Sequence, residues 1–132
     1  MRAGVGVIET VVAHARDARP AECCGILLGR GDEIVEAVRC RNLAEDPNRF
    51  LIDPNDHFAA RRRARAQGLD VIGFYHSHPH SPPAPSPTDV AEASYPDSLY
   101  LIVSLRSDTP EARLFRLESR RFVEMPLVIL DR

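Results

Sequence analysis

Two histidines separated by one residue, His76 and His78, are the side chains of this sequence best suited to chemistry. They follow an apolar run and stand where a buried strand would end. Because side chains alternate between the two faces of a strand, residues i and i+2 present their imidazoles side by side. Asp89 follows behind a proline-rich loop, and this stiff loop can return its carboxylate to the histidines. Two imidazoles and a carboxylate suit a catalytic zinc ion, which takes three protein ligands and leaves one position for water.

Such a site hydrolyses a bond only with a proton acceptor nearby. Bound zinc lowers the pKa of water to about 7 and so makes hydroxide available at neutral pH. A base must take the proton from this water and deliver it to the leaving amine. A carboxylate outside the metal shell is the usual choice, and the sequence must supply one.

Helices and strands that could position these residues alternate along the chain. An amphipathic helix ending before Pro20 is predicted from the helical spacing of Ile8, Val11, Val12 and Ala15. Strands are predicted over residues 24–29, 33–38, 71–75, 99–105, 112–117 and 122–130, with a short one at 50–52. Pro126 interrupts the last strand or places it at an edge.

Two further helices are predicted on either side of the histidines. Asp53 and Pro54 form a good helix start, and the helix can run to Gln67 with Gly68 as its cap. Residues 77–87 hold five prolines, which predicts an irregular but stiff loop, and a short helix is predicted over residues 88–94.

This mixture of elements places the chain in the α/β or α+β class, with a single mixed β-sheet flanked by helices. A length of 132 residues suits one hydrophobic core, and no repeat or linker is visible, so we expect one domain over residues 1–132. Hydrophobic residues make up 44% and charged residues 27%, which is ordinary for a globular protein and argues against disorder.

A longer pattern unites the chemically interesting residues. Glu22 stands directly before the apolar segment 23–29, His76-Ser-His78-Pro follows, and seven residues separate this motif's second histidine from Ser86, with Asp89 three further on. This resembles the signature of the JAMM (MPN+) metalloproteases, and every part of it has the expected spacing. The order of elements is similar over nearly the whole chain, and the absence of insertions is typical of compact prokaryotic members. The resemblance implies the JAMM/MPN fold, which is cytidine deaminase-like.

The resemblance also implies a role for each of five residues. His76, His78 and Asp89 match the zinc ligands, with one Zn²⁺ ion per chain. Glu22 matches the general acid and base. Ser86 matches the serine whose hydroxyl helps to stabilise the oxyanion, although Ser-x-x-Asp also resembles a capping box and the serine can serve as both.

The implied reaction is zinc-dependent hydrolysis of an amide bond at the C-terminal glycine of a ubiquitin-like or sulfur-carrier protein that ends in Gly-Gly. The bond can be a peptide, an isopeptide or a carrier–amino acid link, and some small relatives release an amino acid such as cysteine. The alternative is a non-catalytic MPN-type scaffold that binds proteins, which is expected to lack the ligand set that this chain keeps.

Composition argues against other classes of protein. A formal net charge of −2 gives no attraction to nucleic acid or to an anionic membrane, and no apolar run could span a bilayer. Three cysteines and no secretory signal pattern fit a cytoplasmic protein. The cysteines lack the Cys-x-x-Cys spacing of the zinc deaminases.

The remaining residues of chemical interest have simpler expectations. His80, His14 and His57 are expected at the surface, and Cys23 and Cys24 as small buried residues. The basic run of the second helix is expected to form a solvated face, at Arg61, Arg62, Arg63 and Arg65.

Overall fold

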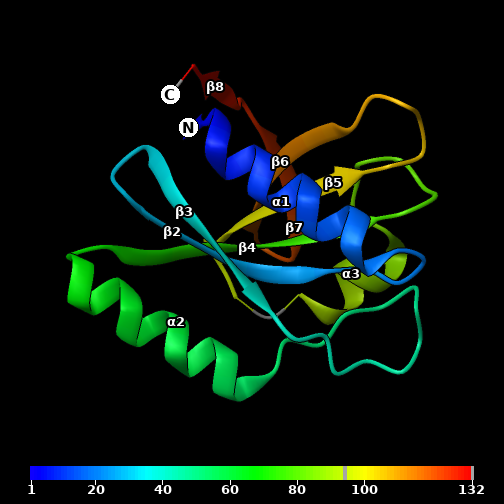
Figure 1. Ribbon diagram of the computed structural model, residues 1–132, viewed down its shortest axis with the longest axis horizontal. Coiled ribbons are helices and arrows are strands. Elements are labelled where there is room, and N and C mark those ends of the chain that lie inside the picture. The colour runs from blue at the N-terminus through cyan, green and yellow to red at the C-terminus, as the bar shows by residue number, and fades with distance from the viewer. Residues whose placement is uncertain (94, 132) are drawn as a thin grey trace.

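The computed structural model describes residues 1–93 and 95–131, which form three helices and one eight-stranded sheet (Figure 1). The helices are α1 (Val5–Ala18), α2 (Pro54–Gln67) and α3 (Pro87–Glu92). The strands are β1 (Arg2–Gly4), β2 (Cys24–Arg30), β3 (Glu33–Cys40), β4 (Asp70–His78), β5 (Leu99–Ser104), β6 (Glu111–Glu118), β7 (Arg121–Met125) and β8 (Val128–Leu130). Among the described residues no helix is long and apolar enough to cross a membrane.

The sheet is mixed, as the sequence predicted. Its strand order is β7-β6-β5-β4-β2-β3-β1-β8. The central strand β4 runs antiparallel to β2 and parallel to β5, and these two neighbours fix its backbone on both sides. β1 and β8 pair in parallel at one edge, which brings the two ends of the chain together (Figure 1).

The two faces of the sheet carry separate apolar clusters because side chains alternate along each strand. On one face α1 inserts Val7, Val11 and Ala15 against the alternate residues Tyr75 and Leu101. On the other face α2 contributes two small residues, Ala60 and Ala64, which pack near Ile26, Phe74 and Tyr100. The face under α2 is therefore only partly filled by its helix.

The helix ends follow the predicted local signals. Asp53 accepts a hydrogen bond from the backbone of Asn55, Pro54 occupies the first turn, and Gly68 closes α2 with a left-handed φ of 67°. α3 begins at Pro87, one residue before the prediction, and ends at Glu92. Ser94, where the predicted helix ended, lies outside the described residues.

One prediction about strands is wrong, and another is confirmed in one of its two forms. Residues 50–52 form no strand and contribute only an isolated bridge between Asn42 and Ile52. Over residues 122–130 Pro126 interrupts the strand, as predicted: β7 ends at Met125, and β8 pairs at the opposite edge of the sheet.

Candidate metal centre and active site

His76 and His78 lie at the end of β4 and point to the same side of the sheet. Both are buried, with 2% of each residue exposed. Their Nε2 atoms are 3.2 Å apart. His76 is in register with Cys24 of β2 and Ile102 of β5, so the strand neighbours hold the backbone of the pair rigidly.

Asp89 reaches these histidines from the first turn of α3. Its Oδ2 atom lies 3.0 Å from Nε2 of His76 and 3.0 Å from Nε2 of His78. A capping box orients this helix: Asp89 donates its backbone N–H to Oγ of Ser86 at 3.0 Å, and Ser86 donates its own to Oδ2 of Asp89 at 2.9 Å. Ser86 thus positions the carboxylate that completes the cluster.

The three atoms fit a tetrahedral metal ion. Among the described residues His76, His78 and Asp89 form a group whose ligand atoms lie close enough to share one ion. Donors that bind a tetrahedral zinc ion at about 2.0 Å lie roughly 3.3 Å from one another, and the observed separations are 3.0 to 3.2 Å.

The proton on His78 gives a second reason to expect a cation. Nδ1 of His78 lies 2.7 Å from the carbonyl oxygen of Pro82, which can only accept, so Nδ1 carries the hydrogen. In the neutral ring Nε2 then has a lone pair that points at the carboxylate of Asp89. A proton or a metal ion must lie between these two acceptors, and a backbone carbonyl behind the ring is the usual support of a metal-binding histidine.

The charges of the cluster agree with this geometry. Burial raises the pKa of Asp89, but the hydrogen bonds from His76 and His78 outweigh it and hold the pKa below its ordinary value. Burial lowers the pKa of His78, whereas its hydrogen bonds to Asp89 and Pro82 raise it, with a net rise. Burial lowers the pKa of His76. The site therefore combines an anionic carboxylate with one ring whose charged form is favoured, that of His78, and one whose neutral form is favoured, that of His76.

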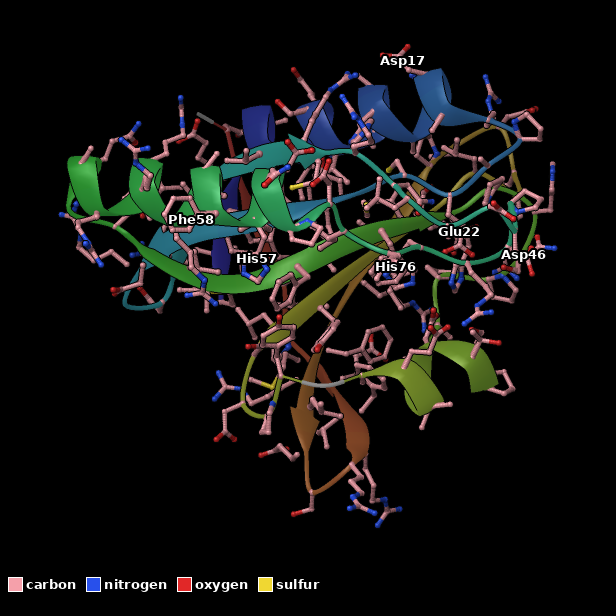
Figure 2. The ribbon with its side chains drawn as sticks, turned by 90° about the horizontal axis from the view of Figure 1, so that it is seen from below. Asp17, Glu22, Asp46, His57, Phe58 and His76 are labelled. Carbon is pink, nitrogen blue, oxygen red and sulfur yellow. The ribbon has the colours of Figure 1, made fainter. Side chains whose placement is uncertain are left out.

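Glu22 lies just ahead of β2, and 6% of the residue is exposed. Its backbone is fixed by hydrogen bonds from Glu22 N–H to Pro47 O and from the Asn42 amide to Glu22 O, both 3.0 Å long. Its Oε1 atom is buried without a hydrogen-bond partner among the described residues. Burial raises the pKa of Glu22 to about 7, with smaller contributions from His78, which lowers it, and Asp89, which raises it. Figure 2 shows Glu22 and His76 in the same part of the molecule.

Comparison with known proteins agrees with a metal site formed by His76, His78 and Asp89. The family model described as "Prokaryotic homologs of the JAB domain" (Prok-JAB) matches residues 5–118. The chain belongs to this family.

Two relatives of this Prok-JAB protein have names that denote the removal of a group from a protein. Desampylase of Haloferax volcanii is 38% identical, over 73% of this chain and 74% of its own length. The CysO-cysteine peptidase of Mycobacterium tuberculosis is 29% identical, over 95% of this chain and 88% of its own. The chain is accordingly a hydrolase of the JAMM metalloprotease type, as the sequence motif implied.

Solved structures confirm the fold. A protein from Desulfitobacterium hafniense has a TM-score of 0.91 at 32% identity, covering 100% of this chain and 94% of its own. A JAB1/MPN domain protein from Archaeoglobus fulgidus has a TM-score of 0.66 at 20% identity, covering 99% and 97%. The predicted JAMM/MPN architecture is therefore correct.

Two buried serines of the Prok-JAB site were not foreseen. Ser77, between the two histidines, points to the opposite face. Its Oγ accepts the backbone N–H of Cys23 at 2.8 Å, and its own N–H donates to Cys23 O at 3.2 Å. Ser77 thus pins the segment that carries Glu22 to the strand that carries the histidines. Ser104 donates to Ser81 O at 2.6 Å and so anchors the proline-rich loop.

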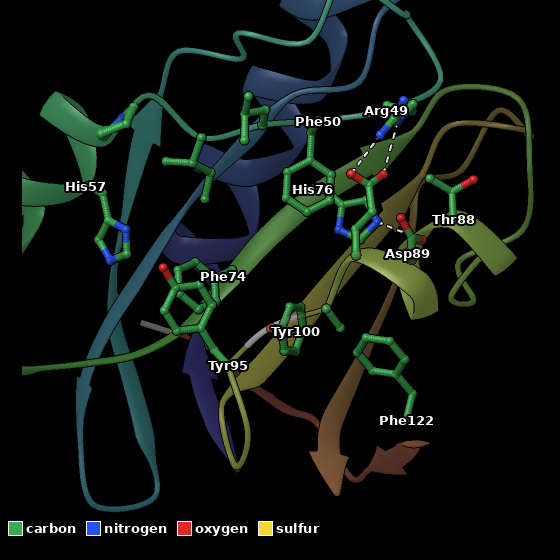
Figure 3. A pocket seen from close by; sticks show the side chains of 15 residues that line it. Arg49, Phe50, His57, Phe74, His76, Thr88, Asp89, Tyr95, Tyr100 and Phe122 are labelled. Atoms are coloured by element: carbon green, nitrogen blue, oxygen red, sulfur yellow. Dashed lines mark hydrogen bonds and ion pairs between the residues drawn. The ribbon is translucent and has the colours of Figure 1, made fainter. Parts of the chain in front are cut away.

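A pocket of about 340 Å³ adjoins the cluster, and its lining includes His76 and Asp89 (Figure 3). Phe50 stacks on the ring of His76, with ring centroids 4.5 Å apart and planes 23° from parallel. Across the pocket rim the guanidinium of Arg49 forms two hydrogen bonds with Glu92, of 3.1 and 2.9 Å. This ion pair ties the segment before α2 to α3.

The simpler expectations for other residues are partly confirmed. His80 is exposed and Cys23 and Cys24 are buried free thiols. The basic run of α2 is solvent-exposed, with an ion pair between Arg63 and Glu36.

The surface prediction is wrong for His57 and His14, because each ring finds a tertiary partner that helical spacing does not reveal. His57 lines the pocket against Phe74 and Tyr95, and His14 lies 2.7 Å from the Tyr75 hydroxyl.

Proposed function

We propose that the chain is a zinc-dependent peptidase or isopeptidase that cleaves an amide bond at the C-terminal glycine of a ubiquitin-like or sulfur-carrier protein. The observation that carries this proposal is the triangle of His76 Nε2, His78 Nε2 and Asp89 Oδ2, with the buried carboxyl of Glu22 beside it. The relatives support the substrate class, since they are named desampylase, CysO-cysteine peptidase and TtuB-protein conjugate cleaving protease.

In this proposal His76, His78 and Asp89 hold one zinc ion per chain. When bound, zinc supplies Lewis-acid polarisation of the scissile carbonyl and a lowered pKa of water. Ser86 fixes the carboxylate of Asp89, and Pro82 fixes the tautomer of His78, so that the three donors are preorganised.

Glu22 is the proposed proton carrier. Its ionised carboxylate takes a proton from the attacking water at Oε1, the atom without a hydrogen-bond partner among the described residues, and returns it to the leaving nitrogen. Desolvation favours this task because it raises the proton affinity of the carboxylate toward neutrality. The hydroxyl of Ser86 accepts from Asp89 N–H, so its hydrogen can donate to the developing oxyanion.

We further propose that residues 1–132 form a single JAMM/MPN+ domain, supported by the single sheet that extends from β1 to β8. The proposed partner is a carrier with a Gly-Gly C-terminus, and nucleic acid and membrane have no proposed role. The proposed location is the cytoplasm, supported by the three free cysteines. A non-catalytic scaffold is the alternative, and it predicts neither bound zinc nor hydrolysis.

Glu22→Gln tests the mechanism. The amide has a similar shape but cannot carry the proton, so we expect the variant to bind as much zinc as the wild type and to cleave a Gly-Gly-linked carrier adduct about 10²- to 10⁴-fold more slowly. Mass spectrometry measures the cleavage and elemental analysis measures the zinc.

Asp46→Asn is the matched control, because Asp46 is an exposed acid on the neighbouring loop that contributes to the electrostatics of Glu22 without lining the cluster. We expect it to retain activity within a few-fold. An active Glu22→Gln protein would show that another group moves the proton.

A further inference from the structure

The pocket beside the metal cluster is built mainly from aromatic rings. Its volume is about 340 Å³. Phe74, Tyr100 and Phe122 line it from strands of the sheet, and Phe50 and Tyr95 line it from two segments outside the sheet. A cavity of about 150 Å³ already holds a benzene ring, so this pocket has room for a large apolar side chain.

The rings form a connected wall. The centroid of Phe74 lies 4.7 Å from that of Tyr95 and 5.7 Å from that of Tyr100, which lies 5.1 Å from that of Phe122. These spacings lie within the range of favourable ring–ring contacts. An aromatic side chain that enters the pocket can therefore form ring–ring contacts like those within its wall.

The pocket is continuous with the cluster. His76 and Asp89 line both, and Phe50 covers the ring of His76 on the pocket side (Figure 3). A substrate whose scissile carbonyl lies at the cluster therefore has the pocket within reach of a side chain close to the cleaved bond.

In a Gly-Gly-linked substrate this side chain belongs to the leaving group. The two residues before the cleaved bond are glycines, which carry no side chain, so the residue attached to the terminal glycine is the first that can enter the pocket. Given the function proposed above, on which this inference rests, we propose that the aromatic pocket binds the side chain of the leaving residue and selects carrier adducts of large apolar or aromatic amino acids.

His57 adds a polar contact at the end of the pocket remote from His76 (Figure 3). Its Nε2 atom is buried without a hydrogen-bond partner among the described residues, and its ring packs edge-on against Phe74 and Tyr95. Burial and the charge of Arg61 lower the pKa of His57, so the ring stays neutral and can exchange one hydrogen bond with a hydroxyl. A tyrosine side chain can pack its ring against the aromatic lining and form a hydrogen bond between its hydroxyl and Nε2 of His57.

The first experiment varies the leaving residue. A Gly-Gly-ending carrier is joined through its terminal glycine to alanine, leucine, phenylalanine or tyrosine, and kcat/KM is measured with the zinc-loaded protein. Because burying an aromatic side chain stabilises by about 1.5–3 kcal/mol, we expect phenylalanine and tyrosine to exceed alanine by about 10- to 100-fold. Equal rates that depend on Glu22 would overturn the pocket assignment and leave the proposed function standing.

A binding measurement distinguishes failure of the pocket assignment from failure of the proposed function. Gly-Gly-Phe and Gly-Gly-Ala are titrated into zinc-loaded Glu22→Gln protein and followed by NMR shifts of the backbone amides. We expect Gly-Gly-Phe to bind at least tenfold more tightly and to shift residues of the pocket. Equal affinity overturns the inference even if no adduct is hydrolysed, whereas selective binding without hydrolysis by the wild type would overturn the proposed function alone.

Neighbouring residues of β7 provide matched variants. Phe122 lines the pocket, and Val123 points to the other face with 43% of its surface exposed. We expect Phe122→Ala to lower the phenylalanine-to-alanine ratio about tenfold and Val123→Ala to keep it.

Tyr95→Ala gives a second variant, at a residue that is 41% exposed and so less important to the core. We expect Tyr95→Ala to lower the phenylalanine-to-alanine ratio of kcat/KM as well. An unchanged ratio in both pocket variants, or a preference that follows the third-last residue of the carrier instead, would contradict the proposal.

Discussion

The hydroxyl of Ser86 is expected to have two roles, as helix N-cap and as oxyanion donor, which substitutions can separate. As a cap, its oxygen accepts the backbone N–H of Asp89. Alanine at an N-cap costs about 1 kcal/mol, whereas glycine costs only a few tenths. As an oxyanion donor, the hydroxyl is missing from both variants, and loss of such a donor costs about 10²- to 10³-fold in kcat.

We therefore expect Ser86→Ala and Ser86→Gly to lose kcat alike, while only Ser86→Ala loses about 1 kcal/mol of unfolding free energy. Urea unfolding and steady-state kinetics measure the two quantities. A glycine variant with nearly full kcat would leave Ser86 the role of a cap alone.

Single residues of the site were predictable where their roles depend on local spacing. His76 and His78 share a strand face, and Ser86 and Asp89 share the first turn of a helix, so the sequence separation alone relates each pair. Ser77 and His57 were not foreseen because their partners, Cys23 and Tyr95, are distant in the sequence. Ser77 still carried a signal: it alternates with the histidines and so had to face the opposite side of the strand.

The contact between α1 and β4 predicts a dependence of stability on pH. Burial and nearby Arg39 lower the pKa of His14 to about 4, with Asp17 opposing them. The neutral ring accepts a hydrogen bond from the Tyr75 hydroxyl at 2.7 Å, since burial keeps the pKa of Tyr75 above its ordinary value. The unfolded chain binds the proton with a pKa near 6.5, so stability is complete above that pH and falls as the pH drops toward 4.

His14→Gln keeps an acceptor for Tyr75 but does not titrate. At pH 5 we expect the loss of unfolding free energy relative to pH 7.5 to be smaller in the variant by on the order of 1 kcal/mol, after allowance for solvent screening of a half-buried ring. Urea unfolding at the two pH values gives both numbers. Identical pH dependence in the two proteins would mean that folding leaves the pKa of His14 at its value in the unfolded chain.

At the scale of elements, strong local signals predicted α2 and the central strands well. The Asp53-Pro54 start and the Gly68 end are decided by backbone conformation within a few residues. The short strand β1 was missed, because its three residues become a strand only by pairing with β3 and β8. Residues 50–52 have strand-like composition, yet they line the pocket, and the bridge between Ile52 and Asn42 stands apart from the named strands.

At the scale of the whole molecule, the cluster of His76, His78 and Asp89 connects the sheet to α3, the helix with the least apolar packing. α3 has six residues, none of them buried, so apolar packing contributes little to its position. Its attachments are the capping box, the exposed Arg49–Glu92 ion pair and the contact of Asp89 with the two histidines. A metal ion at the cluster would therefore fix α3 and the proline-rich loop against β4.

Removal of zinc is accordingly expected to act on the global stability and on one region in particular. At a free zinc concentration 100 times the dissociation constant, binding stabilises the fold by about 2.7 kcal/mol, which for a domain of this size corresponds to roughly 10 °C in Tm. We expect a chelator to lower the Tm of the wild type by this amount and to speed hydrogen exchange most strongly at residues 79–92. Asp89→Asn, which lacks the anionic ligand, should melt at the same temperature with and without chelator. A chelator-insensitive wild type that had been shown to contain zinc would place the ion elsewhere than at the triangle of His76, His78 and Asp89.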